Sequence, residues 1–200
     1  MKQGWWLSIV VAVGLAACAG SPSPPLRYYQ LRLEPPAGEA GATRASAPQP
    51  DVWQLVSVRL PDYLDRDALW LAVGANALQP MDGHRWAEPL RATVPRVLAH
   101  DLGVLRGADR VWSGSVPAGV AVARQIRVEV LEFGPAPDGR AVRLRARWTI
   151  TDPHGGGAAQ IGETEVEAPS AGRAPESQVD AHRLALWRLA QRMAERASPA

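Results

Sequence analysis

The sequence contains very little cysteine and lysine, and this excludes several kinds of chemistry. Cys18 is the only cysteine among 200 residues, which rules out a disulfide within the chain and a cysteine-rich zinc site. Lys2 is the only lysine, and every other basic residue is an arginine. Because no basic block occurs, this arginine usage indicates a GC-rich genome rather than a nucleic-acid-binding protein.

Motifs of common enzyme classes are missing as well. The chain has no G-x-S-x-G, P-loop or Rossmann glycine pattern. Its histidines show no metal-ligand spacing, and we expect each of the four to be a solvated surface residue: His84, His100, His154 and His182. We therefore predict no catalytic residue, no metal and no cofactor. A serine or carboxylate site assembled from distant residues remains an open alternative.

Three acidic residues, Asp62, Asp65 and Asp67, are the nearest thing to a catalytic cluster. Paired carboxylates can perform acid–base chemistry. However, a loop in which aspartate alternates with arginine more often forms local caps and ion pairs. We expect the second role here.

What the chain does have is an N-terminal signal that ends at Cys18. Lys2 supplies a positive start, and an apolar run from Trp5 to Ala17 follows. This run is shorter than the ~20 residues that span a bilayer, and it has the layout of a secretory signal. The alternative is an ordinary secretory signal with a chance cysteine.

The residues Leu15-Ala16-Ala17-Cys18 resemble the lipobox of bacterial lipoproteins. In that motif the cysteine thiol receives a diacylglycerol, because the thiolate is the nucleophile. Several acyl chains on one residue give stable anchoring. The residue after Cys18 is Ala19 rather than aspartate, which resembles an outer-membrane address with the protein facing the periplasm.

The sequence predicts a division into three parts. Residues 1–17 form the signal peptide, 18–25 form the lipidated cysteine and a flexible Pro/Ser tether, and 26–198 form one domain. The hydrophobic share of 46% predicts a globular core. After cleavage 21 basic and 20 acidic residues remain, so the net charge is near +1.

Hydrophobic periodicity predicts strands and two main helices. The strands are expected at 26–33, 52–60, 69–73, 77–81, 109–116, 121–133, 141–151 and 160–168, with a turn at Asp82-Gly83. The last of them is expected at a sheet edge. These strands and helices predict an α/β fold: a single domain with a mixed β-sheet of about six to eight strands and two main helices, in a three-layer-like arrangement.

The two helices are predicted at 86–102 and at 177–197. Pro95 must kink the first helix or mark its true start. Ser177 and Asp180 resemble a capping box at the start of the second. Arg183 and the other arginines of this helix are expected on its solvated side.

Four further stretches resemble one known family, the ABC-type transport auxiliary lipoprotein components (the PqiC-like proteins). Tyr28-Tyr29-Gln30-Leu31 is similar to the family's YY-x-L strand, and residues 56–66 resemble its V-x-L-P-x-Y-L-D-R segment. Residues 86–90 match its W-A-E-P-L motif, and residues 143–148 resemble its L-x-A-x-W strand. With the lipobox, five motifs occur in the family's order over nearly the whole mature chain.

The resemblance implies a non-enzymatic outer-membrane lipoprotein that faces the periplasm and binds no nucleic acid. Its partner would be an MCE-domain protein of a system that moves lipids or other hydrophobic molecules between the two membranes. Cys18 would carry the acyl chains. The residues expected to contact the partner are Pro61, Tyr63, Leu64, Asp65, Arg66, Trp86, Glu88, Pro89 and Leu90. Core and turn roles are the alternative for Trp86, Leu90 and the two prolines.

Other functions remain open at this point. The chain could be an assembly or plug lipoprotein for an outer-membrane β-barrel, or a lipoprotein hydrolase. A homo-oligomer is also plausible, because a symmetric partner favours a symmetric cap.

Overall fold

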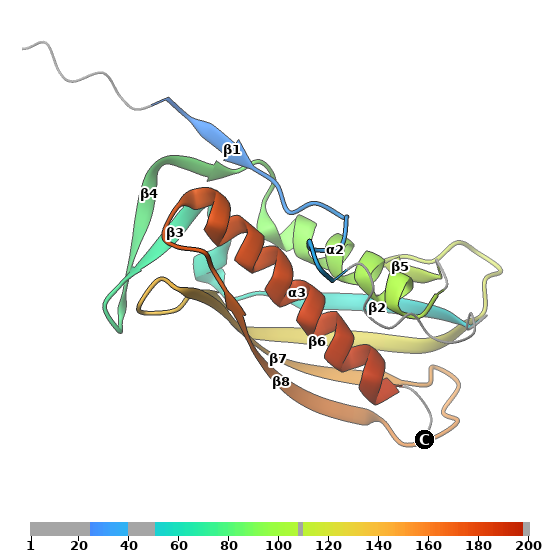
Figure 1. Ribbon diagram of the computed structural model, residues 1–200. Helices are drawn as coiled ribbons and strands as arrows, with labels where there is room; N and C mark the ends of the chain where they lie inside the picture. The colour runs from blue at the N-terminus through green and yellow to red at the C-terminus, as the bar shows by residue number, and fades with distance from the viewer. Residues whose placement is uncertain (1–24, 40–50, 108–109, 198–200) are drawn as a thin grey trace, which may run out of the picture.

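The computed structural model describes residues 25–39, 51–107 and 110–197, and Cys18, the signal peptide and most of the tether lie outside this part (Figure 1). Eight strands and two α-helices are found within it. The strands are β1 (Arg27–Tyr29), β2 (Val52–Arg59), β3 (Ala68–Val73), β4 (Ala77–Trp86), β5 (Val111–Ser113), β6 (Val122–Pro135), β7 (Ala141–Thr151) and β8 (Gln160–Pro169). The helices are α2 (Leu90–Leu105), α3 (Pro175–Ala197) and a short 3-10 turn, η1 (Asp62–Leu64).

The larger sheet has five strands in the order β5-β2-β6-β7-β8. It is mixed, because β2 runs parallel to both β5 and β6 while β6, β7 and β8 are antiparallel neighbours. Strict alternation in β7 places Val142, Leu144 and Ala146 in the core, each with no exposed surface. The prediction of β8 as an edge strand is confirmed.

The smaller sheet has three strands in the order β1-β4-β3. The strands expected at 69–73 and 77–81 are confirmed and pair as an antiparallel hairpin, but β4 is longer than predicted. The turn expected at Asp82-Gly83 is wrong, since both residues lie inside β4. Gly83 has φ +75°, a conformation that glycine adopts without a Cβ clash, so the pair bends the strand without ending it.

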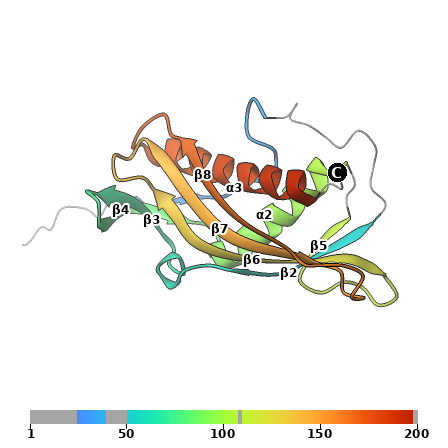
Figure 2. The same cartoon turned by 90° about the horizontal axis from the view of Figure 1, so that it is seen from below.

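Both helices pack on the same face of the larger sheet, and its other face carries no helix in the described part of the chain (Figure 2). α2 continues through Pro95, which is compatible with a helix here because the carbonyl it leaves unbonded belongs to the exposed Arg91. α3 begins at Pro175, where a missing N–H has no cost. The capping box expected at Ser177 is therefore wrong, because Ser177 lies inside the first turn.

The α/β class, the single domain and the two main helices are confirmed by the structure. The strands are divided between two sheets, and the core lies between the larger sheet and the helices. No helix among the described residues is long and apolar enough to cross a membrane.

Candidate functional site

The structure brings two of the motif segments together, residues 61–67 and residues 85–91. The backbone N–H of Trp86 donates to the carbonyl of Asp67 at 2.6 Å. Arg85 lies 3.7 Å from the Asp67 carboxylate, and Arg91 forms an ion pair with Asp65. These aspartates therefore make local ion pairs, as the alternation of aspartate and arginine indicated.

Three of the nine residues proposed to contact a partner lie in the core. Leu64, Trp86 and Leu90 are 4%, 5% and 2% exposed and belong to the main hydrophobic cluster. A fully buried side chain of this size stabilises a fold by about 1.5–3 kcal/mol. These buried side chains anchor the two segments to the core. This is the core role that the sequence left open as the alternative for Trp86 and Leu90.

Other members of the set shape the backbone. Pro61 directly precedes η1, and Pro89 is the N-terminal cap residue of α2. Glu88 accepts a hydrogen bond from Arg96 at 2.6 Å, which positions its carboxylate beside the first turns of α2. Tyr63, Asp65, Arg66 and Pro89 remain exposed. Together with Arg91 we call them the junction surface.

Tyr63 links the junction surface to the larger sheet. Its hydroxyl donates to the carbonyl of Phe133 at 3.4 Å and accepts from the Phe133 N–H at 3.2 Å. Partial burial raises the pKa of the Tyr63 phenol, and the backbone hydrogen bond of Phe133 opposes this shift. The exposed residues around Tyr63 are thus presented on a rigid base.

A second network ties the start of the domain to α3. The Tyr29 hydroxyl donates to Glu176 Oε1 at 3.0 Å and lies 2.8 Å from His84 Nδ1. Desolvation raises the pKa of Tyr29, and the carboxylate of Glu176 adds to this rise. The pKa of Glu176 is lowered by its own backbone N–H and by Tyr29. One tyrosine therefore connects β1, β4 and the first turn of α3.

A buried ion pair joins α2, α3 and the N-terminal segment, and the sequence did not reveal it. Arg183 donates to both carboxylate oxygens of Asp101 at 2.7 Å. The same guanidinium donates to the carbonyls of Leu33 and Glu34 at 3.0 and 3.2 Å. The expected solvated position of Arg183 is wrong, because the residue is only 6% exposed. Burial raises the pKa of Asp101, and Arg183 opposes this rise.

His182 is also misplaced by the sequence-based prediction. It is 6% exposed and packs edge-on against Trp86 and Phe133. Its Nδ1 lies 2.6 Å from the carbonyl of Gln178, which can only accept, so Nδ1 carries the proton of a neutral ring. Burial lowers the pKa of His182 to about 4. Among the described residues no group of three or more His, Cys, Asp or Glu side chains could hold a metal ion.

A family model described as "ABC-type transport auxiliary lipoprotein component" matches residues 29–194. The chain belongs to this family. The match includes all nine proposed contact residues, the Tyr29 network and the Asp101–Arg183 pair, whereas Cys18 lies before its first residue. Membership of a lipoprotein family implies a membrane-anchored periplasmic protein that serves a transport system.

Solved structures share the fold of this auxiliary lipoprotein. The crystal structure of an uncharacterised protein superposes with a TM-score of 0.68 at 17% identity, covering 88% of this chain and all of that one. A DUF330-family protein from Xanthomonas campestris gives 0.66 at 13% identity, over 84% of this chain and 92% of that one. At these identities the likeness shows the fold alone. No curated protein matches the sequence.

Proposed function

We propose that this auxiliary lipoprotein is a non-enzymatic component of an MCE-domain transport system. It is anchored at the outer membrane, faces the periplasm and helps to move lipids or other hydrophobic molecules between the two membranes. The observation that carries the proposal is the family match over residues 29–194, together with the lipobox that ends at Cys18. Two ion pairs, Arg91–Asp65 and Arg96–Glu88, lie at the proposed contact surface, so it is not the unpaired basic patch that a nucleic-acid site needs.

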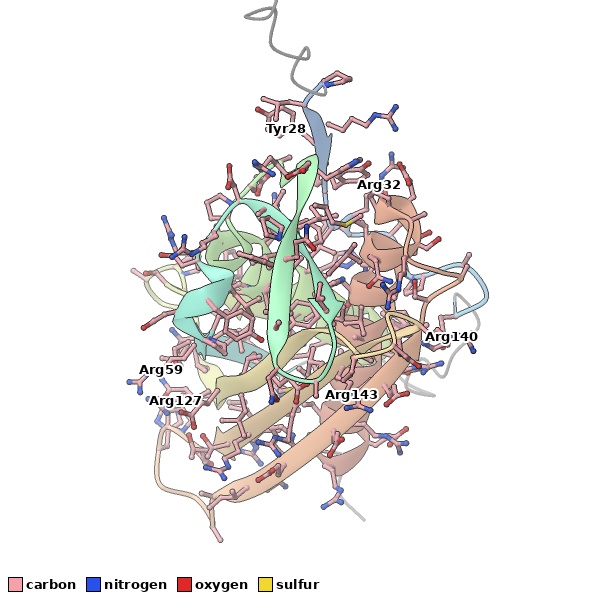
Figure 3. The ribbon with its side chains drawn as sticks, turned by 90° about the vertical axis from the view of Figure 1, so that its left-hand side faces the viewer. Tyr28, Arg32, Arg59, Arg127, Arg140 and Arg143 are labelled. Atoms are coloured by element: carbon pink, nitrogen blue, oxygen red, sulfur yellow. The ribbon has the colours of Figure 1, made fainter. Side chains whose placement is uncertain are left out.

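Anchoring would place one end of the domain near the membrane. Residues 1–17 would be the cleaved signal, 18–25 the lipidated cysteine and tether, and 26–198 the domain. Cys18 and Pro25 are seven residues apart, so the chain between them spans at most about 25 Å. β1 lies at the edge of the smaller sheet, close to the start of the described chain, and its Tyr28 is 64% exposed (Figure 3).

The mechanism would be positional. Acyl chains on Cys18 would hold the domain at the membrane, and the junction surface would dock the far end of an MCE assembly. Tyr63, Arg66 and Pro89 supply exposed side chains there, while Leu64, Trp86 and Leu90 fix the backbone beneath them. Aromatic and arginine side chains are the residues most enriched at the energetic centres of protein interfaces.

A pull-down of tagged full-length protein from detergent-solubilised envelopes tests the partner. We expect an MCE-domain protein to be the main protein recovered, and we expect Tyr63→Ala with Arg66→Glu to reduce its recovery. Arg196→Glu, at an exposed position near the end of α3, is the matched control. Recovery of an integral β-barrel protein in place of an MCE-domain protein would favour the assembly or plug function.

A second experiment tests the anchor. Cys18→Ser should leave a folded protein that no longer sediments with outer membranes and no longer complements a deletion. Full complementation by Cys18→Ser would contradict the positional mechanism. The mass of the detergent-solubilised complex, measured on the same preparations, tests whether the lipoprotein forms a homo-oligomer.

A further inference from the structure

The helix-free face of the larger sheet carries its charges in columns that follow the strands. Arg143, Arg145 and Arg147 form a basic column on β7. β8 places Glu167, Glu165 and Glu163 opposite them, and β6 places Glu132 opposite Arg145 and Glu129 opposite Arg147. Two of these cross-strand pairs are ion pairs at 3.1 Å, Arg143–Glu167 and Arg147–Glu163. Arg59 on β2 lies opposite Glu129. Arg127, two residues before Glu129 on β6, is the basic exception in that column, and it lines the same surface hollow as Arg59 (Figure 3).

The sheet ends at β8, so the outermost column of charges is acidic. β8 is the last strand of the sheet, and it pairs with β7 over its whole length without a register shift. The described part of the chain places no strand against its outer edge. A long and regular edge of this kind is a template for another strand unless the protein blocks it.

The free edge of β8 presents the backbone groups of its outward-facing residues. Just beyond the strand, the N–H of Ser170 donates to the carbonyl of Arg140. Hydrogen-bonded pairs recur at every second residue of an antiparallel ladder, so this bond determines which residues of β8 bond to β7. Even-numbered residues of β8 therefore bond to β7, while Ile161, Glu163, Glu165 and Glu167 direct their N–H and C=O groups outward. Arg188 agrees with this direction, because its Nη1 donates to the carbonyl of Glu167 at 2.8 Å.

Ile161 adds an exposed apolar side chain to this strand. At 76% it is the most exposed of the large hydrophobic side chains in the described chain, and it shares a face with the three glutamates. A groove of about 320 Å³ lies beside the strand, between Glu165–Glu167 on β8 and Arg188, Gln191, Arg192 and Glu195 on α3. Side chains on the other face of an added strand would enter this groove.

The charges decide which occupant fits. A second copy of the chain could pair its own β8 antiparallel to this β8. In a register where all three glutamates of each copy have a partner, every glutamate would face a glutamate. Like charges directly opposite each other destabilise a sheet. The segments outside the described part, residues 1–24, 40–50, 108–109 and 198–200, contain only Lys2 and Arg44 as basic residues. A strand with a basic residue at every second position would instead place a positive charge opposite each glutamate of β8, as β7 does on the other edge of β8.

We propose that β8 binds an extended segment of a partner protein by strand addition. The segment carries arginine or lysine at alternate positions opposite Glu163, Glu165 and Glu167, and an apolar residue opposite Ile161. Backbone hydrogen bonds to Ile161, Glu163 and Glu165 supply the affinity, and the charge pattern supplies the register. This surface is separate from the junction surface and independent of the function proposed above.

A peptide titration tests the proposal. The probe is a fluorescein-labelled peptide of about ten residues that alternates arginine with threonine and ends on valine, and the protein is the full chain in detergent. We expect binding that increases anisotropy, and protection of the amides of residues 160–169 from hydrogen exchange. Replacing the three glutamates by glutamine should weaken binding about tenfold, since each cross-strand charge pair contributes modestly.

Matched controls separate strand addition from simple charge attraction. Glu129→Gln with Glu132→Gln removes charge from β6 and should leave binding nearly unchanged. Glu165→Pro removes an N–H that faces the free edge, so it should weaken binding without loss of a β7 hydrogen bond. Ile161→Ser should weaken binding without a change in thermal stability, because the side chain is exposed.

Three outcomes would overturn the proposal. The first is no binding by the alternating peptide. The second is equal binding by a peptide of the same composition with its arginines consecutive, or equal binding to Glu165→Pro. The third is protection by the peptide of a segment other than β8. Dimerisation of the unliganded protein through β8, seen as protection that depends on protein concentration, would identify a second copy as the occupant and refute a partner segment.

Discussion

Arg183→Met is the substitution from which we expect the largest effect on stability. Methionine keeps much of the apolar stem of the side chain but removes the guanidinium that contacts Asp101 and the carbonyls of Leu33 and Glu34. Asp101 has no exposed side-chain surface, so its charge would be left buried and without its strongest partner. Breaking a buried pair by removing one member costs about 3–5 kcal/mol.

This magnitude is large compared with the stability of a domain of this size. A change of 1 kcal/mol moves the melting temperature by roughly 2–4 °C in such domains, so we expect a decrease of roughly 6–20 °C. Arg192→Met on the same helix is the control, because Arg192 is exposed and its ion pair with Glu195 is a surface contact. Its effect should stay below about 1 kcal/mol.

The pH dependence distinguishes a lost charge pair from lost packing. In Arg183→Met, burial raises the pKa of Asp101, and only the weaker contact with His100 opposes this rise. The folded variant then binds a proton more readily than the unfolded chain, so its stability relative to the native protein should recover as the pH falls. Asp101→Asn leaves Arg183 charged at every accessible pH. The stability that this variant loses relative to the native protein should therefore not return as the pH falls.

Urea unfolding followed by tryptophan fluorescence measures these effects, since the guanidinium of Arg183 lies 5.9 Å from the ring of Trp187. Arg183→Met combined with Asp101→Leu should be more stable than either single variant, because no buried charge remains. A loss below about 1 kcal/mol in Arg183→Met, or a double variant no better than the singles, would refute this account of the pair.

Three further predictions concern other contacts within the fold. The pKa of His182 is about 4 in the folded protein against 6.5 in the unfolded chain, so its neutral ring should add roughly 3 kcal/mol to the free energy of unfolding above pH 6.5. This contribution should be lost as the pH falls through 4. His182→Asn should flatten this part of the pH profile measured by urea denaturation. Gly162→Ala should cost about 1–3 kcal/mol, because the new Cβ would overlap the indole of Trp148, whereas Gly134→Ala, which meets no atom within 4 Å, should be nearly neutral in thermal unfolding. Tyr29→Phe removes the contacts with His84 and Glu176, so it should lower stability slightly and should speed hydrogen exchange in β1 more than in β7.

Local patterns in the sequence were sufficient for the long elements. β7 was predicted with its observed bounds because its alternation runs unbroken through eleven residues between a hairpin and a glycine turn. α3 was predicted within two residues of its start, since an apolar stripe recurs along it. The strand predicted at 26–33 is only three residues long, because β1 leaves the sheet after Tyr29 and residues 33 and 34 contact Arg183 instead.

The remaining features depend on partners that are distant in the sequence. The helical pattern places Arg183 opposite the apolar stripe of α3, and the lack of metal-ligand spacing favours a surface position for His182. The environments of both residues come instead from Asp101, Trp86 and Phe133. The division of the strands into two sheets is also a long-range property, since β1 pairs with β4 more than fifty residues away. In the candidate site, the motifs mark two segments that the fold brings together, whereas only the fold separates the buried Leu64 from the exposed Arg66.

The contacts of the N-terminal segment bear on how an anchor at Cys18 would act. β1 pairs with β4 over only three residues, which is too short to resist a pull along the tether by backbone bonds alone. Tyr29 adds a link to Glu176, and Arg183 holds the carbonyls of Leu33 and Glu34 from α3. A force on the tether would therefore pass to α3 and, through Asp101, to α2, whose first turn adjoins the junction surface. Weakening the Asp101–Arg183 pair should then loosen the connection between anchor and docking surface before it unfolds the larger sheet.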